Sequence, residues 1–89
     1  MRVKHLAWDS QNIEHILLHD VLPEEVEEVF ARKSRIRKGR QKTYVAYGVT
    51  DFGRHLIVVF KYLSQETGRV ITARDMTSRE KRLYKTKGK

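Results

Sequence analysis

Two helices are expected in the first third of the chain, where apolar residues recur three and four positions apart. The first helix runs to about His19, and Asp9 or Ser10 can cap its N-terminus. The second begins at Pro23, which suits a first helical turn, and the glutamates that follow favour the positive end of the helix dipole. The apolar residues that define the two stripes are Ile13, Ile16, Leu17, Val26, Val29 and Phe30.

After residue 42 the apolar residues alternate instead, with the period of 2 that is typical of β-strands. Strands are predicted at residues 43–49, 55–63 and 69–74, separated by a turn at 51–54 and a hairpin loop at 64–68. The second of these strands is apolar on both faces, so we expect it in the middle of the sheet. Residues 2–8 form either a further short strand or an extended lead-in.

A helix start signal lies near the end of the chain. Thr77 and Glu80 match the S/T-x-x-E capping box, which predicts a short helix from there to about Lys85. No internal repeat or linker divides the 89 residues, and a single domain over residues 1–89 is expected. The predicted fold is α+β, with two N-terminal helices, an antiparallel sheet of three or four strands and a C-terminal helix.

The composition excludes several kinds of chemistry. No cysteine is present, which rules out disulfides, thiolate metal sites and cysteine nucleophiles. The glycines match no phosphate-loop motif, so nucleotide-driven chemistry is not expected. His15 and His19 stand at a metal-ligand spacing without a third ligand, and neither a metal nor a cofactor is expected. The longest apolar run has five residues, whereas a membrane span needs about 20, so we expect a soluble cytoplasmic protein.

Basic residues are in excess, 19 Lys and Arg against 11 Asp and Glu, and they are clustered. Residues 31–43 hold seven basic side chains and no acid, and residues 74–89 hold seven against two acids. Such clusters attract polyanions, and nucleic acid is the first partner to consider. The alternative is that these are solvated charges, or cations that protect an edge strand. The RNA-binding candidates are Arg35, Arg37, Lys38, Arg40, Lys42, Arg79 and Arg82.

Two arginines are candidates for chemistry on a phosphate. A guanidinium binds phosphate through a planar fork, so Arg54 beside the turn and Arg74 at the end of the last strand would hold a phosphodiester if they converge at a sheet edge. Ion pairing with Asp75, Glu80 or the acidic run at residues 24–28 is the alternative.

His19 and Tyr84 each permit two interpretations. His19 at a helix end either interacts with the dipole there or titrates at a corner between elements. Tyr84, one helical turn after Glu80, is either a core residue or a phenol aimed at a substrate.

Three segments of the chain resemble the BrnT family of toxins. The family's opening pattern “W-D…N…K-H-G-V…E-E…F” is matched by Trp8, Asp9, Asn12, His19, Val21, Glu24, Glu25 and Phe30, although Leu18 and Asp20 replace the Lys and Gly around the histidine. Gly53 and Arg54 before residues 56–59 look like the family's central hairpin. Residues 69–74 followed by 77–84 look like its ending, so the resemblance covers about residues 7–84.

The resemblance implies a RelE-like fold and a type II toxin–antitoxin pair, in which a metal-independent ribonuclease is neutralised by a ribbon-helix-helix antitoxin of the BrnA type. We expect an endoribonuclease in which the 2′-hydroxyl of RNA attacks the neighbouring phosphate. In this hypothesis Arg54 and Arg74 bind the phosphate, His19 is the general base or acid, and Tyr84 orients the substrate or assists proton transfer. A non-catalytic nucleic-acid-binding module and a topoisomerase-inhibiting toxin on the same fold are the alternatives.

Overall fold

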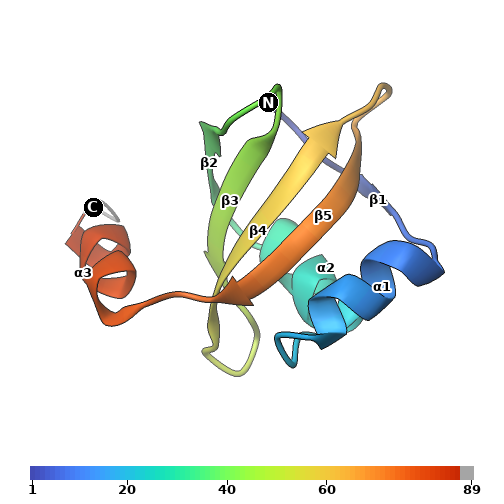
Figure 1. Ribbon diagram of the computed structural model, residues 1–89. Coiled ribbons are helices and arrows are strands. Elements are labelled where there is room, and N and C mark those ends of the chain that lie inside the picture. Colours follow the sequence, from blue (N-terminus) through green and yellow to red (C-terminus); the bar gives the residue numbers. More distant parts are fainter. Residues whose placement is uncertain (87–89) are drawn as a thin grey trace.

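The computed structural model describes residues 1–86 and contains three helices and five strands (Figure 1). The α+β class is confirmed. In chain order the elements are β1 (His5–Ala7), α1 (Ser10–Leu17), α2 (Pro23–Ala31), β2 (Arg35–Lys38), β3 (Tyr44–Val49), β4 (His55–Tyr62), β5 (Thr67–Asp75) and α3 (Ser78–Thr86). The three helices and the three long strands lie where the sequence pattern predicts them.

The five strands form one mixed sheet in the order β1-β5-β4-β3-β2. The prediction of an antiparallel sheet of three or four strands is wrong in two respects. The N-terminal residues form β1, which pairs in parallel with β5, and the basic run after α2 forms the edge strand β2. The other pairs are antiparallel, and β4 lies in the middle, as its two apolar faces predict.

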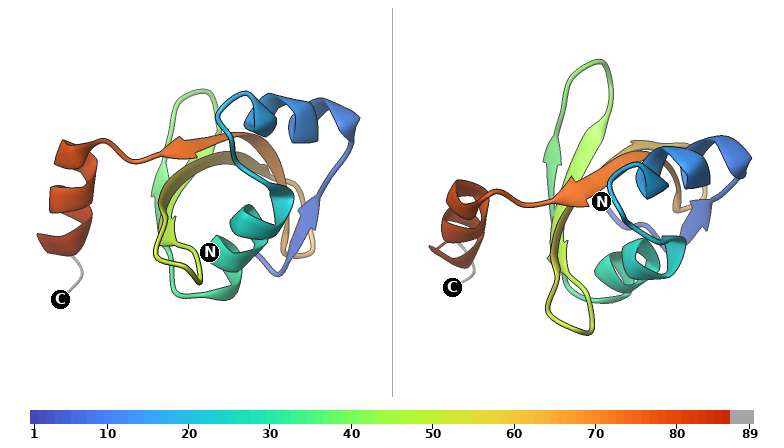
Figure 2. Two further views of the ribbon diagram at one scale, coloured as in Figure 1. Left: turned by 90° about the horizontal axis from the view of Figure 1, so that it is seen from below. Right: turned by 60° about the horizontal axis from the view of Figure 1, so that its bottom comes forward.

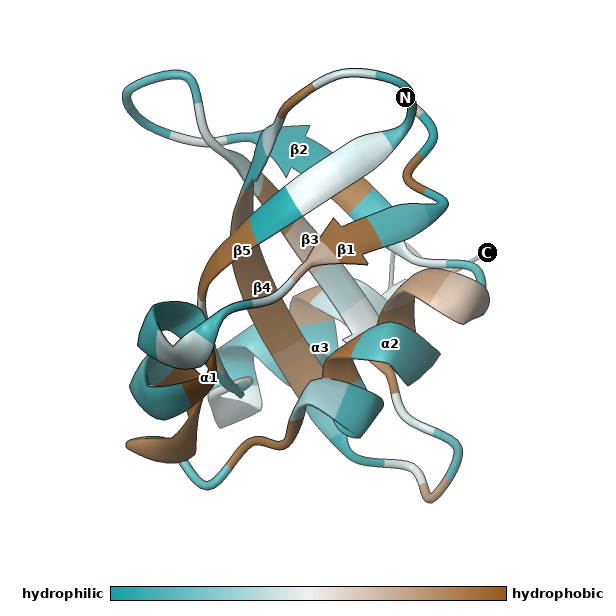
Figure 3. Ribbon diagram, turned by 90° about the vertical axis from the view of Figure 1, so that its right-hand side faces the viewer, coloured by the Kyte–Doolittle hydropathy of each residue, from teal (hydrophilic) through white to brown (hydrophobic). Residues whose placement is uncertain are grey.

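Helices α1 and α2 cover one face of the sheet, which curls around α2 (Figure 2). The core lies between them: Leu56, Val58 and Phe60 of β4 are fully buried, and in Figure 3 that strand is largely brown behind the helices. Gly48 lets α2 approach β3, because a Cβ there would come 2.7 Å from Cγ1 of Val29. The other fully buried apolar residues of this core are Ile16, Val21, Val26, Val29, Ala46, Val70 and Ala73.

The predicted helix starts are confirmed in detail. Asp9 caps α1, its carboxylate accepting from the backbone N–H of Asn12 while Asn12 Oδ1 accepts from the backbone N–H of Asp9. Thr77 and Glu80 form the predicted capping box of α3. Leu17 departs from the predicted stripe, since α1 ends there and the side chain is exposed, whereas Ile16 is buried.

Helix α3 stands apart, on the side of the sheet opposite α1 and α2 (Figures 1 and 2). None of its residues is buried. Met76, just before it, is buried, and its backbone N–H donates to the carbonyl of His55, which prolongs the β4–β5 pairing. The sheet face that does not contact α1 and α2, called here the open face, is therefore bordered by α3.

Candidate functional site

Strand register places four residues in a row across the open face. Arg35 pairs with Tyr47, Tyr47 with Ile57, and Ile57 with Arg74. Directly paired residues project from the same face of a sheet. The row therefore reads cation, aromatic, aliphatic, cation, from the edge strand β2 to β5, and it brings together two arginines that are far apart in the sequence.

Helix α3 lies beside this row and forms a cleft with it. A pocket of about 260 Å³ occupies the cleft. Tyr47 lies on its sheet side, and Tyr84 and Leu83 contribute from α3. The residues that line it are Arg35, Arg37, Tyr47, Glu80, Leu83 and Tyr84. We call this recess, together with the adjoining Arg74 and His55, the α3 cleft.

Arg74 holds α3 in place through Glu80. Its two terminal nitrogens donate to the two carboxylate oxygens of Glu80 at 2.9 and 3.0 Å, and one of them also donates to the carbonyl of Asp75. The bidentate pair and the backbone N–H of Thr77 lower the pKa of Glu80 to about 2 and raise the pKa of Arg74. Arg74 is thus charged, partly exposed and already matched to an oxyanion of planar shape.

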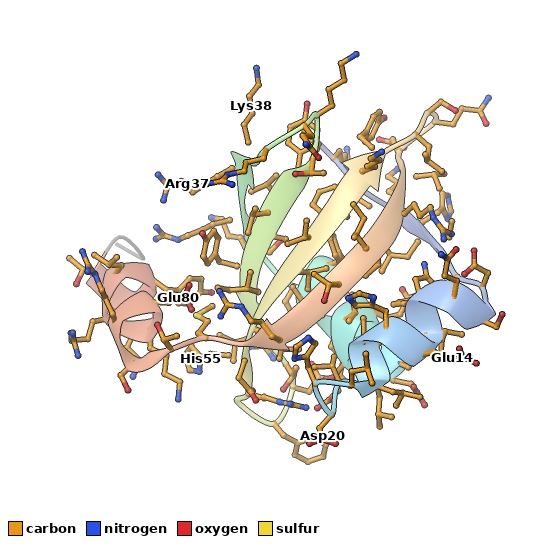
Figure 4. The ribbon with its side chains drawn as sticks, in the orientation of Figure 1. Glu14, Asp20, Arg37, Lys38, His55 and Glu80 are labelled. Carbon is orange, nitrogen blue, oxygen red and sulfur yellow. The ribbon has the colours of Figure 1, made fainter. Side chains whose placement is uncertain are left out.

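Tyr84 is surrounded by polar and cationic groups rather than by the core. The guanidinium of Arg35 lies over its ring, 5.4 Å from the centroid, and the imidazole of His55 meets it edge to face at 5.9 Å. In Figure 4, His55 and Glu80 lie on the α3 side of the sheet, and Arg37 projects from β2 on that side. Arg35, His55 and Tyr84 are all half-buried.

Arg54 lies elsewhere, in what we call the corner network. Nε and Nη2 donate to the carboxylate of Asp75 at 2.7 and 3.1 Å, and Nη1 donates to Glu25 at 2.9 Å. Further bonds go to the carbonyls of Asp20 and His19, so the guanidinium makes as many hydrogen bonds as it has N–H groups. The hydrogen-bonded ion pair between Arg54 and Asp75 raises the pKa of Arg54 and lowers the pKa of Asp75. Arg54 thereby ties the α1–α2 loop to α2 and β5.

The expected convergence of Arg54 and Arg74 on one phosphate is wrong. Asp75, which binds the Arg54 guanidinium, and Arg74 are consecutive in β5, so their side chains project from opposite faces. The sequence alternative of ion pairing is what the structure shows for both arginines.

His19 follows α1 at the same corner. Its side chain is exposed, and its carbonyl is the group that Arg54 contacts, at 3.4 Å. Asp20, beside it, lies at the bottom of the molecule in Figure 4, away from Glu80. The structure therefore groups the four predicted catalytic residues in two pairs, Arg74 with Tyr84 in the α3 cleft and His19 with Arg54 in the corner network.

The predicted RNA-binding residues divide in a similar way. Arg35 and Arg37 line the cleft. Lys38 ends β2, and Arg40 and Lys42 occupy the exposed hairpin loop that joins it to β3. Arg79 and Arg82 are exposed on α3. Of these cations, only Arg35 and Arg37 line the cleft itself; Lys38, Arg40 and Lys42 lie farther along the hairpin, and Lys38 is at the top of the molecule in Figure 4.

Sequence reasoning missed Tyr47, His55 and Leu83 as site residues. Tyr47 lies on the open face, where it pairs with Arg35 and Ile57. Counting residue pairs outward from the turn at residues 51–54 aligns position 47 with 57 and position 49 with 55, which was the available signal. What the pattern could not supply is the side of the sheet to which α3 returns.

Within residues 1–86, no group of three or more His, Asp or Glu side chains is arranged to hold a metal ion. The helices described here are all too short and too polar to cross a membrane.

Comparison with protein families identifies residues 8–80 as a match to the family described as the ribonuclease toxin BrnT of type II toxin–antitoxin systems. The chain belongs to the BrnT toxin family. It is accordingly a toxin of a type II toxin–antitoxin system, with RNA as its substrate and an antitoxin as its partner. Neither the curated proteins nor the solved structures provide a significant match.

Proposed function

We propose that this BrnT-family chain is a single-domain, RelE-like endoribonuclease that cleaves RNA in the α3 cleft without a metal ion. The observation that supports this most strongly is the row across the open face, which sets Arg35 and Arg74 on one surface beside Tyr84. Guanidinium groups can neutralise a phosphate and the charge that develops on it in the transition state, which is the work a metal ion does in other nucleases.

The proposed reaction is an internal transfer at phosphorus. The 2′-hydroxyl loses its proton to a base in the cleft, and its oxygen forms a bond to the adjacent phosphorus. The bond from phosphorus to the 5′ oxygen of the next nucleotide breaks, and that oxygen takes up a proton. The products are a 2′,3′-cyclic phosphate and a free 5′-hydroxyl, so atoms and charge balance without a co-reactant.

Arg74 binds the scissile phosphate in this proposal by exchanging Glu80 for it. A phosphate offers the same two-oxygen edge that the carboxylate now provides, so the guanidinium keeps its geometry. Tyr84, one helical turn after Glu80, and His55, which meets its ring edge to face, carry groups that donate and accept protons. Arg54 and His19, whose contacts belong to the corner network, keep a structural role instead of the catalytic one that the sequence suggested.

Cleavage of RNA by the purified chain in EDTA tests the proposal. Arg74→Ala should lower the rate about 100-fold or more, the usual cost of removing a group that stabilises transition-state charge. Lys33→Ala removes one positive charge at an exposed position outside the cleft and should leave the rate nearly unchanged. The products should carry cyclic phosphate ends.

Three outcomes would reject it: RNA that stays intact, cleavage that requires an added metal, or equal loss in the two variants. RNA binding without any turnover would favour the non-catalytic module, and cleaved chromosomal DNA on expression would favour the topoisomerase inhibitor.

The antitoxin is proposed to be a small ribbon-helix-helix protein of the BrnA type, encoded beside this chain. The cations around the cleft would attract an acidic partner and speed its association. Co-expression of the adjacent reading frame should give a complex that survives purification and does not cleave RNA. If the two products separate, this part of the proposal fails.

A further inference from the structure

The pocket of the α3 cleft has a shape and lining that the cleavage chemistry alone does not require. Two tyrosine rings and Leu83 form much of its wall, and charged groups lie at its rim. We propose that this pocket receives one unpaired nucleobase of the bound RNA, which stacks on the rings of Tyr47 and Tyr84. The inference rests on the proposed function for the position of the scissile phosphate, and on the pocket itself for the base.

The size of the pocket favours one base. Its volume of about 260 Å³ lies just below the range of roughly 300–1,000 Å³ that is usual for drug-sized ligands. A base pair is larger and is stacked on both sides, so it cannot enter a recess of this size. An unpaired base exposes two flat aromatic faces, and tyrosine rings stack on such faces with little regard to base identity.

The row across the open face supports the same ligand. Tyr47 forms the part of the floor that lines the pocket, the buried Ile57 lies next to it, and Arg35 and Arg74 stand at the two ends of the row. Three strand spacings separate these ends, roughly 14 Å between backbones. A nucleotide whose base lies over the floor therefore has a cation available for the phosphate on each side of it.

Arg35 links base and phosphate binding. Its guanidinium now covers one face of Tyr84 at 5.4 Å. A base that stacks on Tyr84 takes that place, and the displaced guanidinium is then free for the neighbouring phosphate. Helical A-form RNA offers no such base, because its bases are stacked and its major groove is deep and narrow.

Binding can be measured without cleavage by using fluorescein-labelled oligonucleotides with 2′-O-methyl groups, which lack the attacking hydroxyl. The single strand should bind about 10-fold or more tightly than the same strand annealed to its complement. Tyr47→Leu and Tyr84→Leu should each weaken single-strand binding about 5- to 150-fold, the range expected for loss of one stacking contact. Tyr47→Phe and Tyr84→Phe, which keep the ring, should bind nearly as the parent does.

Tyr62→Leu is the matched control, since Tyr62 is an exposed tyrosine at the far end of β4. Equal binding of single strand and duplex, or loss of affinity in the Tyr62 variant equal to that in the cleft variants, would overturn the inference. Single-strand binding that depends on Tyr47 and Tyr84, combined with no cleavage of ordinary RNA, would uphold the base pocket and refute the proposed function.

Discussion

At the scale of single residues, the Arg74–Glu80 pair explains how the cleft is kept ready for an anion. The carboxylate keeps the guanidinium oriented while no RNA is present, and at the same time holds α3 against the sheet. Because the pKa of Glu80 lies well below its usual range, the carboxylate stays ionised and this pair persists at any pH that a cell experiences.

The pKa of Glu80 gives a direct test of the pair. In an NMR titration its carboxyl carbon should change at a pH of about 2, and in Arg74→Ala the pKa should rise toward the ordinary value of 4.5. Asp75, which is paired with Arg54, should titrate alike in both proteins. Since the folded pKa is lowered, the stabilisation is complete above the unfolded value and is lost as the pH falls toward 2. An unshifted Glu80 in the parent chain would contradict the pair.

The sequence hypothesis assigns proton transfer to His19, whereas the structure favours His55. His55 touches Tyr84 in the cleft, whereas His19 is exposed in the corner network. We predict that His55→Gln lowers RNA cleavage about 100-fold or more, as loss of a general acid or base does. His19→Gln should cleave at close to the parent rate. The reverse ranking would place the proton transfer at the α1–α2 corner.

At the scale of the elements, buried Asn12 joins α1 to two strands. Its side-chain nitrogen donates to the carbonyls of Ala7 in β1 and Val70 in β5, at 2.9 and 3.1 Å. The short parallel strand β1 is therefore held in place by α1 as well as by its backbone hydrogen bonds to β5. Asn12 was among the residues that carried the family resemblance. Its role as a link between three elements became visible only in the structure.

Asn12→Asp should lower the free energy of unfolding by about 2–4 kcal/mol, because a buried carboxylate would face two carbonyls without a donor. Gln11→Glu makes the same chemical change at the exposed neighbouring position and should have little effect. Urea unfolding of the two variants measures the difference. Equal stability of both variants would show that the Asn12 bonds contribute nothing to the fold.

The elements also show which parts of the fold a pattern can predict. Helices α1, α2 and α3 were predicted from stripes and caps that lie within a few residues of each other. Strand β1 has only three residues, and its parallel pairing to β5 joins segments about 60 residues apart, which no local period indicates. An edge strand such as β2 was only one of the interpretations that the sequence allowed for the basic residues at 31–43.

The site was predictable to the extent that it depends on residue type. Arg74, Tyr84, Arg35 and Arg37 were chosen for their chemistry, and the structure brings them to one cleft. Arg54 was chosen for the same chemistry, but it sits among carboxylates on the opposite face. The face of Arg74 is set by strand register and by the irregularity between Val59 and Phe60, which depend on the paired strand rather than on the neighbours of Arg74 in sequence.

At the scale of the whole molecule, charge is divided between two regions. The carboxylates of Glu25 and Asp75 pair with Arg54 at the corner, whereas Arg35 and Arg37 of β2 line the cleft beside the exposed arginines of α3. An approaching RNA is therefore attracted to the open face and repelled from the corner. This separation assigns the corner network to the stability of the fold and the α3 cleft to RNA binding.

The most direct test is to map the RNA-binding surface by NMR, adding a single-stranded 2′-O-methyl oligonucleotide to the labelled chain. The account predicts that amide signals of Arg35, Tyr47, Arg74 and Tyr84 shift, while those of His19 and its neighbours in the corner network stay in place. Shifts confined to His19, Asp20 and Arg54, with the cleft unchanged, would contradict it.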